Sequence, residues 1–223
     1  MENFKSKVLE LAQKSTFDYI QFVNEKYERD IKYLYPNRPS IAKRTRYKEL
    51  LAYYKIKSAI AEAVNPRAIL EIGVRLGYSA AAFLHKNPFS LYIGIDNSTL
   101  EVTNLDYANF ILIKNYSQAK IFIHRNNSDI ISDGWRKTFN YPLFDLIHID
   151  GSHDTMSCYS DLYRAKEVSN VKGIIVVDDY FNNACPGVGR ACKRFQNETN
   201  LPFCEIDSCR GNGEFILRND IIY

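Results

Sequence analysis

Residues 69–83, ILEIGVRLGYSAAAF, indicate how the chain folds. An apolar run breaks at Gly73 and Gly77, and an alanine series with helical character follows. Glycine has no Cβ atom, so the backbone there can turn sharply and come close to a bound molecule. The stretch therefore predicts a buried strand, a tight glycine turn and a helix.

Length and composition favour one domain. The chain has 223 residues, of which 46% are hydrophobic, enough for one sizeable core. We expect a helical cap over residues 1–66 and a catalytic core over 67–223. Basic and acidic residues nearly balance, at 29 and 26, so no global charge favours nucleic acid or an acidic membrane. The sequence contains neither an export signal nor an apolar run long enough for a membrane span, which predicts a cytoplasmic protein.

Before the core, the sequence predicts two helices and a loop. Apolar spacing favours a first helix over residues 4–26. The aromatic, basic and proline-broken residues 33–48 are typical of a loop. A second helix is expected over 47–64, ending before Pro66, because proline disfavours helical geometry in the residue before it.

From residue 68 onward, short apolar runs alternate with segments of helix length. This alternation predicts a parallel sheet with helical crossovers, and the last two runs predict an antiparallel hairpin at its edge. The expected fold is α/β, a mostly parallel seven-stranded sheet with helices on both faces. The strand candidates are AILEIG, LYIGID, KIFIHR, LFDLIHID, GIIVVDD, PFCEID and EFILRN.

The strand exits carry the candidate site, because ligands of open parallel sheets bind beyond the carboxyl ends of the strands. Small polar or acidic residues stand at each exit. They are Glu71 and Gly73, Asp96, Asn127 and Ser128, Asp150, and the pair Asp178 and Asp179.

Two exits favour a nucleoside-like ligand. After Gly73 and Gly77, Tyr78 and Ser79 add hydroxyl groups, and the start of the helix offers free N–H groups to a carboxylate or phosphate. Asp96 ends the second strand, where a carboxylate can accept both hydroxyls of a ribose. The alternatives are that the glycines only permit tight packing and that Asp96 caps a turn or helix.

Two further exits predict a metal site. Asp150, Asp178 and Asp179 would place three carboxylates on adjacent strand ends, which is costly unless a cation lies between them. Magnesium suits oxygen ligands and leaves positions open for a substrate. Alternatively, Asp150 and Asp179 cap the helices that follow. The five cysteines show no metal-binding or disulfide spacing, and we leave them outside the site.

These motifs resemble those of a known family. EIGVRLGYS, GIDNS, FDLIHIDGSH and GIIVVDDY are similar to the corresponding motifs of the S-adenosylmethionine-dependent O-methyltransferases of the catechol and caffeoyl-coenzyme A type, and more closely to those of the macrolide-sugar enzymes. The resemblance covers residues 68–223. It implies the Rossmann-like methyltransferase fold and S-adenosylmethionine as cofactor.

The resemblance also implies residue roles. Glu71, Gly73, Tyr78 and Ser79 would surround the methionine portion and Asp96 would hold the ribose. Asn127 and Ser128 would lie along the adenine, and the three aspartates would hold the metal. His153 stands where the sugar-type enzymes carry a base, and an imidazole titrates near neutrality. His85, His124 and His148 are interpreted as structural.

The expected function is therefore metal-assisted O-methylation of a small hydroxylated molecule, such as a sugar or a phenol. Residues 33–46 and the loop YFNNACPGVG would choose the substrate, the loop acting as a lid. One alternative is a nucleic-acid methyltransferase, favoured by the basic cluster Lys43, Arg44, Arg46 and Lys48. The other is a nucleotide-binding protein without turnover. The sequence does not decide between a monomer and a homo-oligomer.

Overall fold

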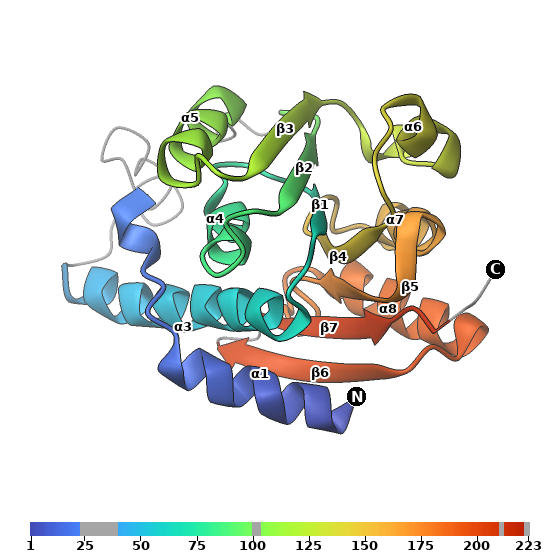
Figure 1. The fold of residues 1–223 in the computed structure, drawn as a ribbon. Coiled ribbons are helices and arrows are strands. Elements are labelled where there is room, and N and C mark those ends of the chain that lie inside the picture. The colour runs from blue at the N-terminus through green and yellow to red at the C-terminus, as the bar shows by residue number, and fades with distance from the viewer. Residues whose placement is uncertain (23–39, 100–103, 210–211, 221–223) are drawn as a thin grey trace.

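The sheet has the strand order β3-β2-β1-β4-β5-β7-β6. This computed structural model describes residues 1–22, 40–99, 104–209 and 212–220 (Figure 1). The first five strands are parallel, and β7 and β6 are antiparallel to their neighbours. The strands are β1 (Ala68–Ile72), β2 (Leu91–Asp96), β3 (Lys120–Arg125), β4 (Phe144–Ile149), β5 (Ser169–Val177), β6 (Phe203–Cys209) and β7 (Asn212–Arg218). The predicted seven-stranded α/β sheet with an antiparallel C-terminal hairpin is confirmed.

Helices cover both faces of the sheet (Figure 1). Successive side chains of a strand point to opposite faces, so Ile69 packs into one core and Leu70 into the other. The helices and helical turns are α1 (Glu2–Lys14), η1 (Tyr19–Phe22), α3 (Ser40–Val64), α4 (Tyr78–Leu84), α5 (Leu105–Asn115), η2 (Ser128–Ile130), α6 (Asp133–Thr138), α7 (Thr155–Val168) and α8 (Pro186–Thr199). The first core holds residues of α1, α3, α4 and α5, and the second holds residues of α7 and α8.

The helices before the core differ from the sequence-based prediction. The first ends at Lys14, because Ser15 turns into extended geometry, and only the short η1 follows. The second, α3, begins at Ser40, so residues 40–48 are helical and the predicted loop over 33–48 was wrong there. Residues 33–39 of that loop lie outside the described residues.

α3 runs beside β7, and Lys57 on α3 forms an ion pair with Glu214 on β7 (Figure 1). Its buried face includes Tyr53, Lys57 and Ile60. None of the described helices combines the length and the apolar character that a bilayer crossing requires.

Candidate active site

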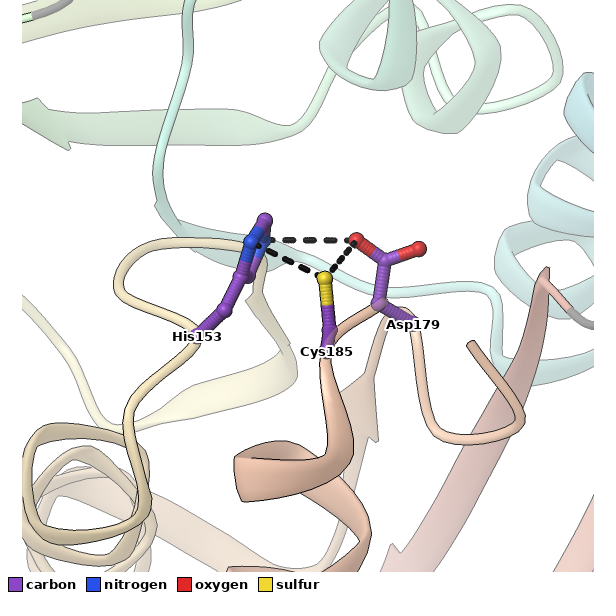
Figure 2. Close-up of side chains that lie close together, drawn as sticks. All are labelled: His153, Asp179 and Cys185. Atoms are coloured by element: carbon purple, nitrogen blue, oxygen red, sulfur yellow. Dashed lines mark hydrogen bonds and ion pairs between the residues drawn. The ribbon is translucent and has the colours of Figure 1, made fainter. Parts of the chain in front are cut away.

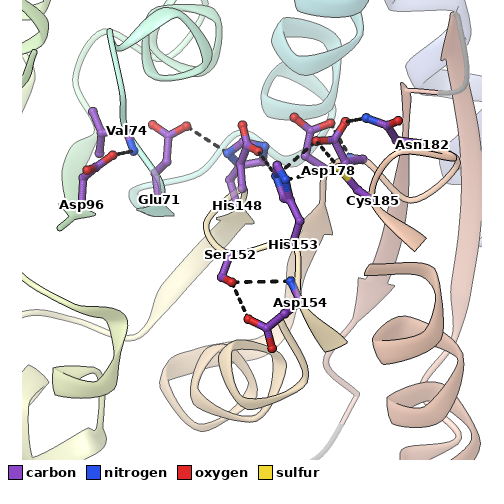
Figure 3. Close-up of polar contacts among 12 residues, drawn as sticks. Glu71, Val74, Asp96, His148, Ser152, His153, Asp154, Asp178, Asn182 and Cys185 are labelled. Carbon is purple, nitrogen blue, oxygen red and sulfur yellow. Dashed lines mark hydrogen bonds and ion pairs between the residues drawn. The ribbon is translucent and has the colours of Figure 1, made fainter. Parts of the chain in front are cut away.

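Four strand exits meet at one edge of the sheet (Figure 3). The N–H of Gly73, beyond β1, donates to Ile95 on β2 over 2.8 Å. The N–H groups of Asp150 and Asp178 donate to Ile72 and Ile149 on the neighbouring strands. Backbone hydrogen bonds between neighbouring strands therefore continue just past the strand ends. They place the predicted site residues at the exits of β1, β2, β4 and β5 side by side.

The glycine turn is required by packing. Gly73 has a φ of 91°, and a Cβ atom there would lie 2.0 Å from the carbonyl oxygen of Asp150. Gly77 has a φ of 78°, and its Cβ would lie 3.1 Å from that of Ala108 on α5. Both positions thus need glycine for backbone conformation and close approach. The packing alternative accounts for the glycines by itself, and their contact with a ligand stays a prediction.

Asp96 holds the glycine turn in place. Its Oδ2 accepts the N–H groups of Val74 and Arg75, each over 2.9 Å, and its Oδ1 accepts that of Ser98 over 2.6 Å. A carboxylate offers about four acceptor positions, so roughly one is left for a ligand hydroxyl. The helix that follows, α5, is capped by Asn104 and not by Asp96.

Beneath the turn, a chain of polar contacts runs through the first core. Glu71 and His148 are fully buried, and Oε1 of Glu71 lies 2.9 Å from Nδ1 of His148. The Tyr92 hydroxyl donates to the other oxygen of Glu71. Because Glu71 is enclosed, it contacts no ligand directly in this conformation, and the prediction that it surrounds the methionine portion is not tested.

Lys57 lies at the centre of this network and is fully buried. Its Nζ is 2.6 Å from Nε2 of His148, 2.9 Å from Oδ2 of Asp178 and 3.5 Å from Oε1 of Glu214. Burial opposes the charge on Lys57, but Asp178 and Glu214 outweigh burial and raise its pKa. The ammonium group therefore donates to His148, whose Nδ1–H is left to donate to Glu71.

Asp178 is neutralised by protein groups. Burial would raise its pKa, but the charge of Lys57 and the hydrogen bond from Tyr53 lower it to about 2. Oδ2 accepts from Lys57 and from the Tyr53 hydroxyl, and Oδ1 accepts the N–H of Asp179. Burial also raises the pKa of Glu214 well above its usual range. The oxygens of Asp178 are thus already occupied by hydrogen bonds from inside the protein.

This arrangement decides how well a magnesium ion would fit. Among the described residues, two sets of three place their donor atoms within 4.8 Å of one another. One set is His148, Asp150 and Asp178, and the other is His153, Asp179 and Cys185. The three predicted carboxylates are thus divided between the sets, and Asp178 already holds a cation, Lys57. A magnesium ion on all three carboxylates does not fit this structure.

His153 stands at the open side of the site, with 45% of its side chain exposed. Its Nε2 lies 3.3 Å from Oδ2 of Asp179 and 3.9 Å from Oδ1 of Asp150, and its Nδ1 lies 3.2 Å from Sγ of Cys185. The contact with Asp150 raises the pKa of His153, and Asp179 adds to the rise. Burial and the charge of Asp178 raise the pKa of Asp150 to about 6.

The capping alternative for Asp150 and Asp179 is not what the structure has. Asp154 caps α7 by accepting the N–H groups of Met156 and Ser157, both over 3.0 Å. Cys185 is the residue before α8. Asp179 instead accepts from the amide of Asn182, and Asp150 faces His153. Both carboxylates are therefore available to the site.

The other predicted cofactor residues differ in availability. Tyr78 and Ser79 are half-buried at the start of α4, and the Tyr78 ring packs against Tyr54. Asn127 is exposed and accepts from the Asn97 amide. The hydroxyl of Ser128 donates to Asp161 over 2.6 Å, which turns it toward α7.

The sequence-based prediction missed Lys57, Glu214 and Cys185, and it gave His148 only a structural role. Lys57 had a signal, because it shares a helical face with Tyr53 and Ile60, where a charged residue is unusual. Glu214 begins the predicted apolar strand EFILRN, and no partner for it lies nearby in the sequence. Cys185 had no such signal. Its neighbours His153 and Asp179 lie on other segments, and only the fold brings the three together.

The predicted lid is only partly a loop. Residues 180–185 form a turn, and Pro186 already begins α8, because proline suits the first helical position. Tyr180 donates its N–H to Gly213, and Cys185 donates to Asn182. The basic cluster proposed for nucleic acid lies at residues 43–48, whose side chains fall outside the described part of the chain.

The sequence and the fold were compared with those of known proteins, and the matches indicate a class of protein. Residues 70–180 match the family model described as a methyltransferase domain. No curated protein sequence matches the chain. Three solved structures share the fold. An O-methyltransferase from Bacillus cereus, in complex with S-adenosylhomocysteine, is 16% identical, with a TM-score of 0.56 over 86% of this chain and 95% of that one.

The second is an O-methyltransferase from Streptomyces achromogenes involved in tomaymycin synthesis, in complex with S-adenosylmethionine. It is 17% identical, with a TM-score of 0.54 over 74% of this chain and 78% of that one. The third is a methyltransferase from Podospora anserina bound to S-adenosylhomocysteine. It is 16% identical, with a TM-score of 0.55 over 96% of this chain and 95% of that one.

The chain therefore contains a methyltransferase domain. Its fold is shared with these solved O-methyltransferases, in agreement with the predicted resemblance to that family. The family match supports the prediction that the protein is a methyltransferase, and methyl transfer to oxygen stays a prediction.

Proposed function

We propose that this protein transfers the methyl group of S-adenosylmethionine to a hydroxyl of a small molecule, such as a sugar or a phenol. The observation that carries the proposal is His153, an exposed imidazole held between Asp150 and Asp179 at the exits of β4 and β5. A general base must come within hydrogen-bond reach of the proton that it takes, and neighbouring carboxylates stabilise its protonated form.

The cofactor would lie along the exits of β1 and β2. Asp96 keeps about one acceptor position for a ribose hydroxyl, and the turn that it holds would face the methionine portion. Tyr78 borders the same turn. The carboxylates of Asp150 and Asp179 lie beyond it, next to the sulfonium expected there.

The proposed reaction is a direct displacement. The substrate hydroxyl gives its proton to the imidazole of His153, and its oxygen forms a bond to the methyl carbon. The bond between that carbon and the cofactor sulfur breaks, and its electron pair stays on sulfur as S-adenosylhomocysteine. Asp150 and Asp179 orient the ring and stabilise the imidazolium, because both face it. The position of the hydroxyl relative to the methyl group supplies the alignment.

Metal assistance belongs to this proposal as a separate question. A magnesium ion held by Asp150, Asp178 and Asp179 would require Asp178 to exchange Lys57 and Tyr53 for the ion. Methyl transfer that needs added magnesium after chelation would support the three-carboxylate site, and transfer that survives chelation would contradict it.

The test of the proposed function is a methyl-transfer screen with radiolabelled S-adenosylmethionine and a panel of sugars and phenols. On an accepted substrate, His153→Gln should lower kcat by about 10²- to 10⁴-fold, the usual contribution of a general base. Binding of S-adenosylhomocysteine should be unchanged. His85→Gln, at the end of α4 and away from the site, is the control. A His153→Gln variant with full activity would contradict the assignment.

A nucleotide-binding protein without turnover is the remaining alternative. It predicts cofactor binding together with no methyl transfer to any hydroxylated compound in the panel. No described residue favours the nucleic-acid alternative, because the basic side chains on which it rests are outside the described part of the chain.

A further inference from the structure

We propose that His153, Asp179 and Cys185 form a binding site for a zinc-like transition-metal ion, and that an ion bound there takes His153 out of its role as base. The site shares Asp179 with the predicted magnesium site, but it uses a thiol and an imidazole and leaves out Asp178. The inhibitory part of the proposal rests on the proposed function. The binding part does not.

The three side chains come from three segments and point at one another (Figure 2). His153 follows β4, Asp179 follows β5, and Cys185 immediately precedes α8. Sγ of Cys185 lies 3.2 Å from Nδ1 of His153 and 4.0 Å from Oδ2 of Asp179. Nε2 of His153 lies 3.3 Å from the same Oδ2.

These separations suit a tetrahedral ion. Zinc binds nitrogen and oxygen ligands at about 2.0–2.2 Å and sulfur at about 2.3 Å, which sets neighbouring ligand atoms roughly 3.3–3.7 Å apart. One ring nitrogen of His153, a carboxylate oxygen of Asp179 and Sγ of Cys185 all lie within 4.8 Å of one another, and Sγ is 4.0 Å from Oδ2 of Asp179. The donor atoms would therefore have to draw together slightly around a bound ion.

The backbone keeps these residues together. A Cβ atom on Gly187, in the first turn of α8, would lie 2.4 Å from the carbonyl oxygen of His153. The start of α8 is thus in direct contact with the His153 segment. Asp179 has a φ of 58°, an unusual conformation for a residue other than glycine, and it turns the side chain back toward the other two.

The chemistry of the donors selects the ion. A thiolate and an imidazole are preferred by zinc and similar ions, whereas magnesium prefers oxygen ligands alone. The site is open to entry, because 45% of the His153 side chain and 14% of that of Asp179 are exposed. Three protein ligands leave a fourth position for water, or for Asp150, whose Oδ1 is 3.9 Å from Nε2 of His153.

An ion at this position would have a direct functional effect. A ring nitrogen bound to zinc cannot accept a proton from a substrate hydroxyl. Zinc should therefore inhibit methyl transfer, and the thiol of Cys185 should set the concentration at which it does so.

The test is titration of the reduced full-length protein with Co²⁺, which reports a thiolate ligand through a sulfur-to-metal charge-transfer band. We expect the band in the wild type and in the control Cys204→Ala, whose thiol is buried on β6. It should be absent in Cys185→Ser. Zinc affinity, measured by competition with a chromophoric chelator, should fall in Cys185→Ser and His153→Gln by more than about 10- to 100-fold, the loss caused by removing even an outer-sphere partner.

A folded, reduced wild type without the charge-transfer band would overturn the site. So would a band that persists in Cys185→Ser. The ratio of activity with zinc to activity without zinc should rise in Cys185→Ser, and an unchanged ratio would overturn the inhibitory role. Titration with S-adenosylhomocysteine keeps the two proposals distinguishable, because lost cofactor binding contradicts the methyltransferase function and leaves the cobalt result unaffected.

Discussion

Lys57 places a positive charge where the sequence predicted a metal ion. Its ammonium group is fully buried between Asp178, Glu214 and His148, and it also lies 4.5 Å from the centre of the Tyr53 ring. Burying a charge is costly unless partners compensate, and here the partners are part of the site. The residue therefore links the stability of the first core to the shape of the active site.

Replacing Lys57 by methionine should destabilise the protein strongly. The change leaves Asp178 buried without its cation, and removing one partner of a buried pair costs about 3–5 kcal/mol. Urea denaturation followed by circular dichroism measures this loss. Lys55→Met, on the same helix and outside the network, is the matched control and should change the free energy of unfolding little. Equal stabilities of the two variants would contradict the role of Lys57.

Some residues of the site could be predicted from the sequence, and others could not. Asp96, Asp150 and Asp179 were predicted from their places at strand ends, because a strand exit is a local feature of the sequence. His153 was predicted from the resemblance of its motif to that of the sugar-type enzymes. Lys57 and Asp178 are 121 residues apart, and no local pattern pairs them. For this reason the sequence predicted Asp178 as a metal ligand, whereas in the structure it is the partner of Lys57. No local pattern pairs Cys185 with His153 either, because the two lie 32 residues apart.

At the scale of elements, Asp154 holds the start of α7 and with it the segment that carries His153. Its carboxylate accepts the N–H groups of Met156 and Ser157 and the hydroxyl of Ser152. The hydrogen bond from Ser152 is the main cause of its lowered pKa, and Ser157 adds to it. The cap should therefore stabilise the fold when the carboxyl is ionised.

Asp154→Ala should lower the free energy of unfolding at pH 7 by about 0.5–2 kcal/mol, the usual value of a helix cap. A lowered pKa means that this stabilisation is present above the ordinary pKa of 3.8 and is lost as the pH falls below it. The difference between wild type and variant should thus shrink toward pH 2 in urea titrations. Asp154→Asn, which keeps a capping oxygen, is the control. A difference that is constant with pH would contradict the charged cap.

The contact between α8 and the His153 segment is a second property of the elements. Gly187→Ala would place a methyl group 2.4 Å from the His153 carbonyl oxygen and 2.9 Å from the Thr155 nitrogen, both backbone atoms. Overpacking of this kind costs about 1–3 kcal/mol.

The measurement is again urea denaturation, and the control is Gly134→Ala on α6. A Cβ atom there would have its nearest neighbour at 3.8 Å, and alanine favours a helix. Gly187→Ala should be the less stable variant. If both variants matched the wild type, α8 would not be pressed against His153 as described.

The elements of the core were predicted well, and those before it less so. Buried parallel strands are continuous apolar runs, and each of the predicted runs forms a strand. The start of α3 was placed too late, because the proline-broken basic stretch was taken as one loop through residue 48. Ser40 directly after Pro39 is a typical helix start, and that signal was present in the sequence.

In the whole molecule, the strand order determines which residues meet at the site. The order β3-β2-β1-β4-β5-β7-β6 puts the exits of β2, β1, β4 and β5 in a row. The proposed cofactor residues lie at the first two exits, and the proposed base and its carboxylates at the other two. Lys57 comes from α3 and Glu214 from β7. In the proposed function, the exits of β1 and β2 bind the cofactor and those of β4 and β5 carry the base.

The central claim is that this chain binds S-adenosylmethionine at the exits of β1 and β2, and isothermal titration calorimetry with S-adenosylhomocysteine tests it most directly. We predict one site per chain, binding that persists after chelation of metals, and affinity that falls at least about tenfold in Asp96→Ala, which loses the ribose acceptor. Circular dichroism would establish that the variant is folded. A folded wild type that takes up no S-adenosylhomocysteine, with or without magnesium, would contradict the account.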